Sequence, residues 1–312
     1  MPRAALIRPL AVTALLLCLV VVVLGAYVRL SAAGLSCPDW PGCYGHISPA
    51  GSAVAGQPFE AGKAWKEMVH RYAAGTLGIL LVFIAAMAIR YRQDKVVSPI
   101  FALGLVALVI LQALFGMLTV TKQLDPAIVT AHLLFGLTTL SLLWWMVLTI
   151  GRRQSTAWRG STAFLGSGLA RTRRLAGLGL VVLAMQLALG GWTSSHYAAT
   201  ACPDFPTCQG QWWPVMQGGV GIHFAHRLGA LFTTVLLLLA SISVLRTRSD
   251  VFARRAALAV LVALALQLVI GVSMVLRGFP LWLATAHNAG AAVLLLAVVA
   301  LVRSLRPAWK PS

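Results

Sequence analysis

Four histidines lie near the starts of long apolar stretches, as two matching pairs: His70, His132, His226 and His287. If those stretches are membrane helices, each histidine lies some five to seven residues, about 8–11 Å, inside at 1.5 Å per residue. Ionisable residues at that depth are costly and usually functional. A single buried histidine is often a hydrogen-bonded core residue. Two pairs at one depth instead favour axial ligation of haem iron within helical bundles. Zinc is disfavoured because neither half groups four ligands.

One carboxylate distinguishes the two pairs. Glu67 precedes His70 by three residues, so both share a helix face, whereas the matching position before His226 is His223. This asymmetry indicates chemistry at the first site and a permanent cofactor at the second. A carboxylate there could take a proton or position water. The alternative is that Glu67 lies at the membrane interface, solvated or paired with Arg71.

An arginine directly follows one histidine in each half, at Arg71 and Arg227. Guanidinium groups match carboxylates well, so these arginines are candidate partners for haem propionates. The alternative is that they extend along the helix to lipid headgroups.

Two C-x5-C pairs lie between the apolar stretches, Cys37 with Cys43 and Cys202 with Cys208. Short Pro-containing loops in an oxidising compartment outside the cytoplasm favour disulfides. Zinc sites and C-x-x-C-H haem attachment sites use other spacings. The second pair is interpreted as a structural staple. For the first pair, beside Glu67, a staple and a redox-active disulfide both stay open.

The amino-acid composition indicates that these side chains belong to a membrane protein. Of 312 residues 59% are hydrophobic and 10% are charged, whereas a soluble domain has about 25% charged residues. A soluble enzyme and a disordered chain are therefore excluded. A spanning helix needs about 20 mostly apolar residues. The stretches that qualify lie at roughly 10–30, 67–89, 99–121, 127–150, 175–194, 220–245, 255–276 and 281–302.

Positive charge predicts the topology. Most of the 25 Lys and Arg residues lie at the two termini and near 90–95, 152–174 and 246–255. Because Lys and Arg mark the cytoplasmic side, both termini are expected in the cytoplasm and the Cys loops outside, in a bacterial cell membrane. The net charge of +18 is then a topology signal, and nucleic acid is excluded as a partner.

The motifs recur in the same order. Cys-Pro-Asp-Trp-Pro-Gly-Cys matches Cys-Pro-Asp-Phe-Pro-Thr-Cys, and the His-Arg and Thr-Ala-His motifs each occur twice. The predicted fold is an all-α membrane protein whose eight helices form two pseudo-symmetric four-helix bundles. Four helices per half make a parallel repeat about an axis along the membrane normal. The predicted domains are an N-terminal half at 1–151, a cytoplasmic linker at 152–174 and a C-terminal half at 175–312.

A Gln-x3-Gly pattern occurs once in the first half and twice in the second. It predicts close helix packing, with the glutamine bonding across to a neighbouring helix. The positions are Gln112 with Gly116, Gln186 with Gly190, and Gln267 with Gly271.

Together these motifs resemble the haem A synthase family over nearly the whole chain. The resemblance rests on Gly25-Ala-Tyr-Val-Arg-Leu-Ser31, the Cys37–Cys43 loop, Glu67-x-x-His70-Arg71, Thr130-Ala131-His132, His226-Arg227 and Thr285-Ala286-His287. It implies an oxidoreductase that converts the C8 methyl group of haem O to a formyl group by successive hydroxylation. The product, haem A, supplies terminal oxidases.

The resemblance also implies roles for individual residues. His70 and His132 would hold the substrate haem, and His226 and His287 a haem b. Glu67 matches the family's essential carboxylate, and the first Cys pair is linked to activity. Members vary in whether both loops carry cysteines, so the second pair need not be catalytic.

Two other functions compete with this interpretation. A di-haem b-type membrane electron carrier would have two non-exchangeable haems and give the Glu67/His223 asymmetry no role. A haem transporter would leave the porphyrin unchanged and favour broken helices, but no predicted span has a central proline. Haem O synthase and oxidase assembly factors are expected partners by family analogy, and the electron acceptor and the role of His223 stay open.

Overall fold

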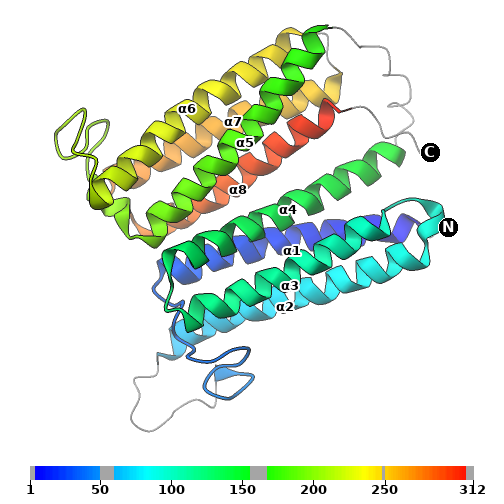
Figure 1. Cartoon of the computed structure of the whole chain (residues 1–312), viewed down its shortest axis with the longest axis horizontal. Helices are drawn as coiled ribbons and strands as arrows, with labels where there is room; N and C mark the ends of the chain where they lie inside the picture. Colours follow the sequence, from blue (N-terminus) through cyan, green and yellow to red (C-terminus); the bar gives the residue numbers. More distant parts are fainter. Residues whose placement is uncertain (1–3, 50–59, 155–166, 248–249, 307–312) are drawn as a thin grey trace. The chain divides into compact units, whose positions relative to one another are not determined.

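The computed structural model describes residues 4–49, 60–154, 167–247 and 250–306. Within these ranges it has eight helices long and apolar enough to cross a membrane, which confirms the predicted fold class. The helices are α1 (Ala4–Leu30), α2 (Ala61–Arg90), α3 (Pro99–Thr121), α4 (Pro126–Gln154), α5 (Ser167–Ser195), α6 (Gly218–Arg246), α7 (Val251–Leu276) and α8 (Leu281–Ser304), with short 3-10 turns η2 (Arg92–Asp94) and η4 (Ala198–Ala201) (Figure 1).

Several helices extend beyond the predicted apolar stretches. The helix predicted from residue 67 begins at Ala61, and that predicted from residue 175 begins at Ser167. Apolar length marks the hydrocarbon layer, but a helix continues wherever its residues favour helix, and Lys, Arg and Ala do. As a result His70 and His226 lie two turns or more into their helices, deeper than the sequence predicts.

The chain divides into two compact units, Met1–Leu143 and Trp144–Ser312, so the division falls within α4. The predicted linker at 152–174 lies partly outside the described residues, and helix α5 extends into its end. The predicted domain limits and the two-fold relation between the halves stay predictions.

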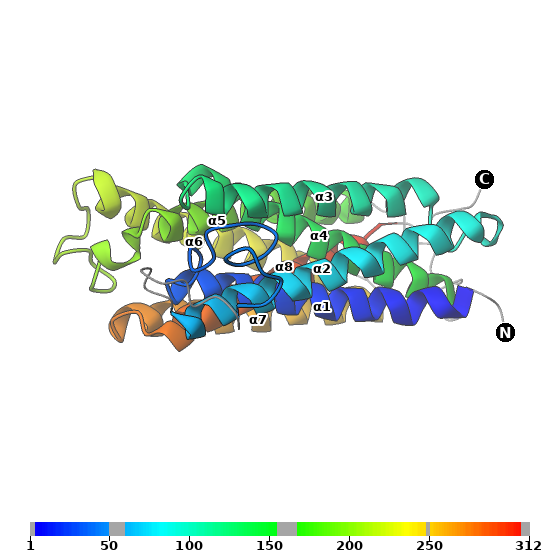
Figure 2. The ribbon, with the colours of Figure 1, turned by 90° about the horizontal axis from the view of Figure 1, so that it is seen from below.

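In the first unit, α2 packs against both α1 and α3. Helix α4 joins them through Gly136, where an added Cβ would lie 3.1 Å from Gln112 of α3 and 3.9 Å from Val22 of α1. The four helices run lengthwise beside one another (Figure 2). Helices α2 and α4 therefore each contact both α1 and α3.

In the second unit, α5 and α7 each pack against both α6 and α8. The four helices therefore close into a bundle in which α6 and α8 lie diagonally across from each other. Such a bundle can house a cofactor between facing helices.

Candidate functional site

Each predicted haem-ligating histidine packs its ring against a glycine on the neighbouring helix. A Cβ added at these glycines would come within 2.9–3.2 Å of the imidazole Cε1. A side chain at any of the four would displace the ring, so the glycines set the ring positions. The pairs are Gly25 with His70, Gly116 with His132, Gly190 with His226, and Gly271 with His287.

Each unit contains one of the two predicted histidine pairs. His70 and His132 both lie in the first unit, and His226 and His287 both lie in the second. In the second unit the helices carrying them are the diagonal pair α6 and α8. Each predicted pair therefore belongs to one unit, and its role as a pair of haem ligands stays a prediction.

The buried imidazoles fit a haem iron. The Nδ1 atoms of His70 and His132 are buried and have no hydrogen-bond partner among the described residues. Neither ring is therefore held at Nδ1 by a hydrogen bond that a bound haem would have to break. No cluster of three or more His, Cys, Asp or Glu side chains occurs in the described ranges. A haem needs only two axial ligands, so this chain's residues suit haem better than a metal ion held by protein alone.

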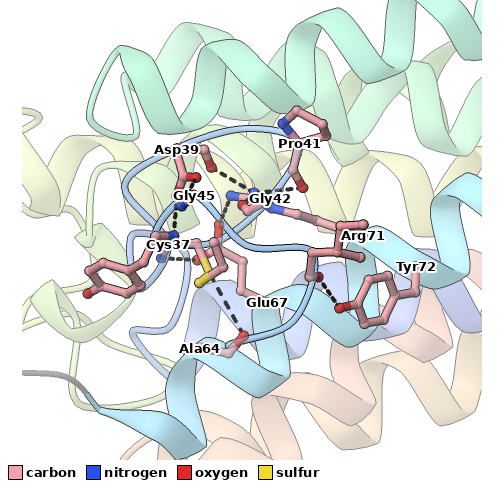
Figure 3. The surroundings of a disulfide bond; sticks show 12 residues. Cys37, Asp39, Pro41, Gly42, Gly45, Ala64, Glu67, Arg71 and Tyr72 are labelled. Atoms are coloured by element: carbon pink, nitrogen blue, oxygen red, sulfur yellow. Dashed lines mark hydrogen bonds and ion pairs between the residues drawn. A yellow bond between two sulfur atoms is a disulfide. The ribbon is translucent and has the colours of Figure 1, made fainter. Parts of the chain in front are cut away.

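Glu67 connects α2 to the first Cys loop (Figure 3). Its side chain is only 5% exposed. Oxygen Oε2 accepts a hydrogen bond from the Cys37 backbone N–H at 3.0 Å, and Oε1 pairs with Arg71 at 2.5 Å. The sequence left open whether Glu67 is paired with Arg71, and the structure shows that it is. The buried carboxylate is thereby held by one charged and one neutral donor.

Arg71 fastens the loop as well as the carboxylate. Its Nη1 donates to the backbone carbonyls of Asp39 at 2.8 Å and Gly42 at 2.5 Å (Figure 3). A planar guanidinium can serve several acceptors at once, so this one side chain joins helix, carboxylate and loop. Sequence reasoning missed these contacts because carbonyl acceptors have no side-chain signature, although the same Cys loop and arginine recur in both halves.

The first Cys loop is a tight, covalently closed turn. Cys37 and Cys43 form a disulfide and are both fully buried, which confirms the predicted pairing. Asp39 accepts hydrogen bonds from the Tyr44 and Gly45 backbone N–H groups, at 2.6 and 2.7 Å. Slight burial acts to raise the pKa of Asp39, but these N–H groups outweigh it and the pKa is lowered. The Cys37 Sγ lies 3.9 Å from the Ala64 carbonyl oxygen, against the same turn of α2 as Glu67.

The second half repeats this arrangement without the carboxylate. Cys202 and Cys208 form the second predicted disulfide. Arg227 donates to the carbonyls of Cys202 at 2.9 Å and Thr207 at 2.8 Å, and its Nε lies 3.3 Å from Nε2 of the buried His223. A neutral imidazole therefore occupies the place of Glu67.

In both halves the arginine beside the predicted ligand histidine binds the carbonyls of its own Cys loop. This contact gives Arg71 and Arg227 a structural role that the sequence did not predict. Their predicted pairing with haem propionates stays a prediction.

The fold and the site define a multi-pass membrane protein with two pairs of intramembrane histidines, each beneath a disulfide-closed loop. The profile of the family described as cytochrome oxidase assembly protein matches residues 8–299. A heme A synthase of Shewanella oneidensis is 40% identical over 90% of this chain and 91% of its own length. A heme A synthase of Halalkalibacterium halodurans is 30% identical over 86% of each chain, and one of Caulobacter vibrioides is 28% identical over 91% of this chain and 92% of its own.

These matches span nearly the whole chain and include all the site residues named above. The chain belongs to the haem A synthase family.

Proposed function

We propose that this chain oxidises the C8 methyl group of haem O to a formyl group and so makes haem A. The observation that carries the proposal is the buried Glu67, held by Arg71 and Cys37 on the helix that bears His70. The second half has His223 in its place. A carboxylate at one haem site only is expected where one site performs chemistry and the other holds a permanent cofactor.

In this proposal His70 and His132 hold the substrate haem O, and His226 and His287 hold a resident haem b. The glycine opposite each ring lets the helices approach closely and fixes the ring orientation. The haem groups supply the redox chemistry, because side chains alone do not oxidise a methyl C–H bond. The protein supplies binding, orientation and electrostatics.

Glu67 is the group that holds or moves the proton. Each hydroxylation would add the oxygen of a water molecule to the methyl carbon and release two protons and two electrons, and a carboxylate can accept a proton or position the water. The hydrate formed by the second hydroxylation then loses water to give the formyl group. Arg71 and the Cys37 backbone N–H hold the Glu67 carboxylate in place on the helix that carries His70. A haem b held by His226 and His287 would relay the released electrons to an acceptor outside the chain.

A di-haem b-type electron carrier is the second candidate. It is favoured by the matching His–Gly contacts in both halves, which would suit two equivalent haems. It leaves the difference between Glu67 and His223 without a purpose.

Eight apolar helices and bacterial relatives fit a multi-pass protein of the bacterial cell membrane. Cytoplasmic termini, Cys loops outside, haem O synthase and oxidase assembly factors as partners, and a redox role for Cys37–Cys43 all belong to the proposal.

The test is expression in a bacterial strain that makes haem O but has lost its own haem A synthase. Appearance of haem A in the membranes is the expected result. Membranes that contain haem O and haem B only, with the protein present at normal levels, would refute the proposed function.

A further inference from the structure

Three of the four ligand histidines have their main chain tied to the neighbouring helix by a glutamine. In each case the glutamine amide nitrogen donates to the backbone carbonyl of the histidine itself. The bonds run from Gln112 to His132 at 2.9 Å, from Gln186 to His226 at 3.0 Å, and from Gln267 to His287 at 3.0 Å.

Each glutamine fits because a glycine lies opposite it, one turn beyond the histidine. A Cβ added there would lie 3.1 Å from the amide at Gly136, 2.2 Å at Gly229 and 2.3 Å at Gly290. The contact is therefore a two-part device, with glutamine on the odd-numbered helix and glycine on the even-numbered one. We call it the glutamine clamp.

In the second half the clamp also reaches the imidazole ring. The Gln186 amide nitrogen lies 3.0 Å from Nδ1 of His226, and that of Gln267 lies 3.2 Å from Nδ1 and 3.3 Å from Nε2 of His287. The amide that donates to the histidine carbonyl therefore also packs against the ring of that histidine.

The pair α1 and α2 has neither part of the clamp. The glutamines precede the glycine at the ring by four residues, and four residues before Gly25 the chain has Val21. One turn beyond His70 it has Ala73 and Ala74, not glycine. The side-chain tie is what differs at His70.

We propose that Gln112, Gln186 and Gln267 are positioning residues for haem ligands, and that Val21 leaves His70 as the ligand that detaches. A substrate site must admit one haem and release another, whereas a resident haem must stay. Two clamps that also contact the ring in the second half, one main-chain clamp at His132 and none at His70 match that requirement. That haem is exchanged at the His70 site rests on the proposed function. That the four histidines are held with different strengths does not.

The expected effect follows from the strength of such bonds. Interhelical hydrogen bonds in membranes change an equilibrium by a factor of roughly three to fifteen. Adding or removing a clamp should therefore change the fraction of time that the histidine spends off the iron by about the same factor. A clamp lowers this fraction.

Carbon monoxide measures this fraction, because it binds ferrous haem only where an axial ligand leaves. We expect the dithionite-reduced holoprotein to bind carbon monoxide at the N-terminal haem and not at the C-terminal haem. The double variant Val21→Gln/Ala73→Gly should slow this binding three- to fifteen-fold. Val21→Leu with Ala73→Gly is the matched control and should not.

The reverse change keeps the proposal testable if the double variant does not fold. Gln186→Leu should make the C-terminal haem reactive to carbon monoxide, whereas Gln123→Leu, a glutamine near the end of α3 that bonds to Val120, should not. Equal reactivity of both wild-type haems, or a C-terminal haem that stays inert in Gln186→Leu, would overturn the proposal. Haem type, read separately by extraction, reports on the proposed function: two b-type haems with graded reactivity would refute that function and leave the clamp intact.

Discussion

Replacing Glu67 with glutamine separates haem binding from catalysis. Glu67 accepts one hydrogen bond from the Cys37 backbone and pairs with Arg71. A glutamine keeps an oxygen for Cys37 but presents an NH₂ group to the guanidinium, so one charge-assisted bond is lost. Neither His70 nor Gly25 is touched, and the ligand ring keeps its position.

The loss of stability should be moderate. A hydrogen bond to a charged group contributes about 1.5–3 kcal/mol. Breaking a buried ion pair costs about 3–5 kcal/mol when it leaves a charge without a partner. Arg71 keeps the carbonyls of Asp39 and Gly42, so we expect the lower range. Loss of a general acid or base lowers a rate by about 10²–10⁴, which exceeds any effect of a partly destabilised fold.

The assay is haem extraction from the purified variant, produced together with a haem O source, with haems separated by chromatography and identified by mass. We expect normal total haem and little or no haem A. Glu60→Gln is the matched control, because Glu60 is an exposed carboxylate at the start of α2 paired only with Lys63 among its described contacts. Haem A formed at the wild-type level in Glu67→Gln would refute the catalytic role of this carboxylate.

Further predictions concern the second half. His226→Ala should lose the resident haem b, measured as the haemochrome content per protein, and unchanged content would exclude His226 as a ligand. Gly271→Leu should also lose that haem, since even a Cβ there lies 3.0 Å from the His287 ring, while Gly104→Leu, where an added Cβ meets nothing within 4 Å, should keep it. The Thr207 hydroxyl and the backbone N–H groups of Gly210 and Gln209 lower the pKa of Asp204 to about 2. The hydrogen bonds by which the Asp204 carboxylate stabilises the second Cys loop should therefore be fully formed above the ordinary pKa of about 4. They should be lost as the pH falls toward 2. Tryptophan fluorescence of the adjacent Trp212 and Trp213 should follow that loss, and Asp204→Asn should abolish the dependence. The double variant Cys202→Ser/Cys208→Ser should still make haem A if the second disulfide is only a staple; haem A loss with haem b retained would contradict that.

The fold could be predicted from the sequence because lipid leaves the backbone few choices. In the hydrocarbon layer every N–H and C=O group must be satisfied within the chain, so an apolar stretch of spanning length becomes a helix. The two disulfides were predictable for a similar reason, since six-residue separation and a Pro-containing turn leave the paired cysteines close together.

The contacts of the site were less predictable. Hydropathy sets the depth of His70 but not the rotation of α2 that turns the ring toward Gly25. Arg71 was expected to face a propionate or lipid, and its loop carbonyl partners could not be read from residue types. The Gln-x3-Gly pattern predicted bonding across helices, but its acceptor, the ligand histidine's own carbonyl, follows only from the packed structure.

The most direct test of the central claim is haem extraction from the wild-type protein, purified from cells that make haem O. The account predicts haem B together with haem A or hydroxylated haem O, one haem type for each histidine pair. Haem B alone, with haem O present in the same membranes, would contradict it and favour the electron carrier.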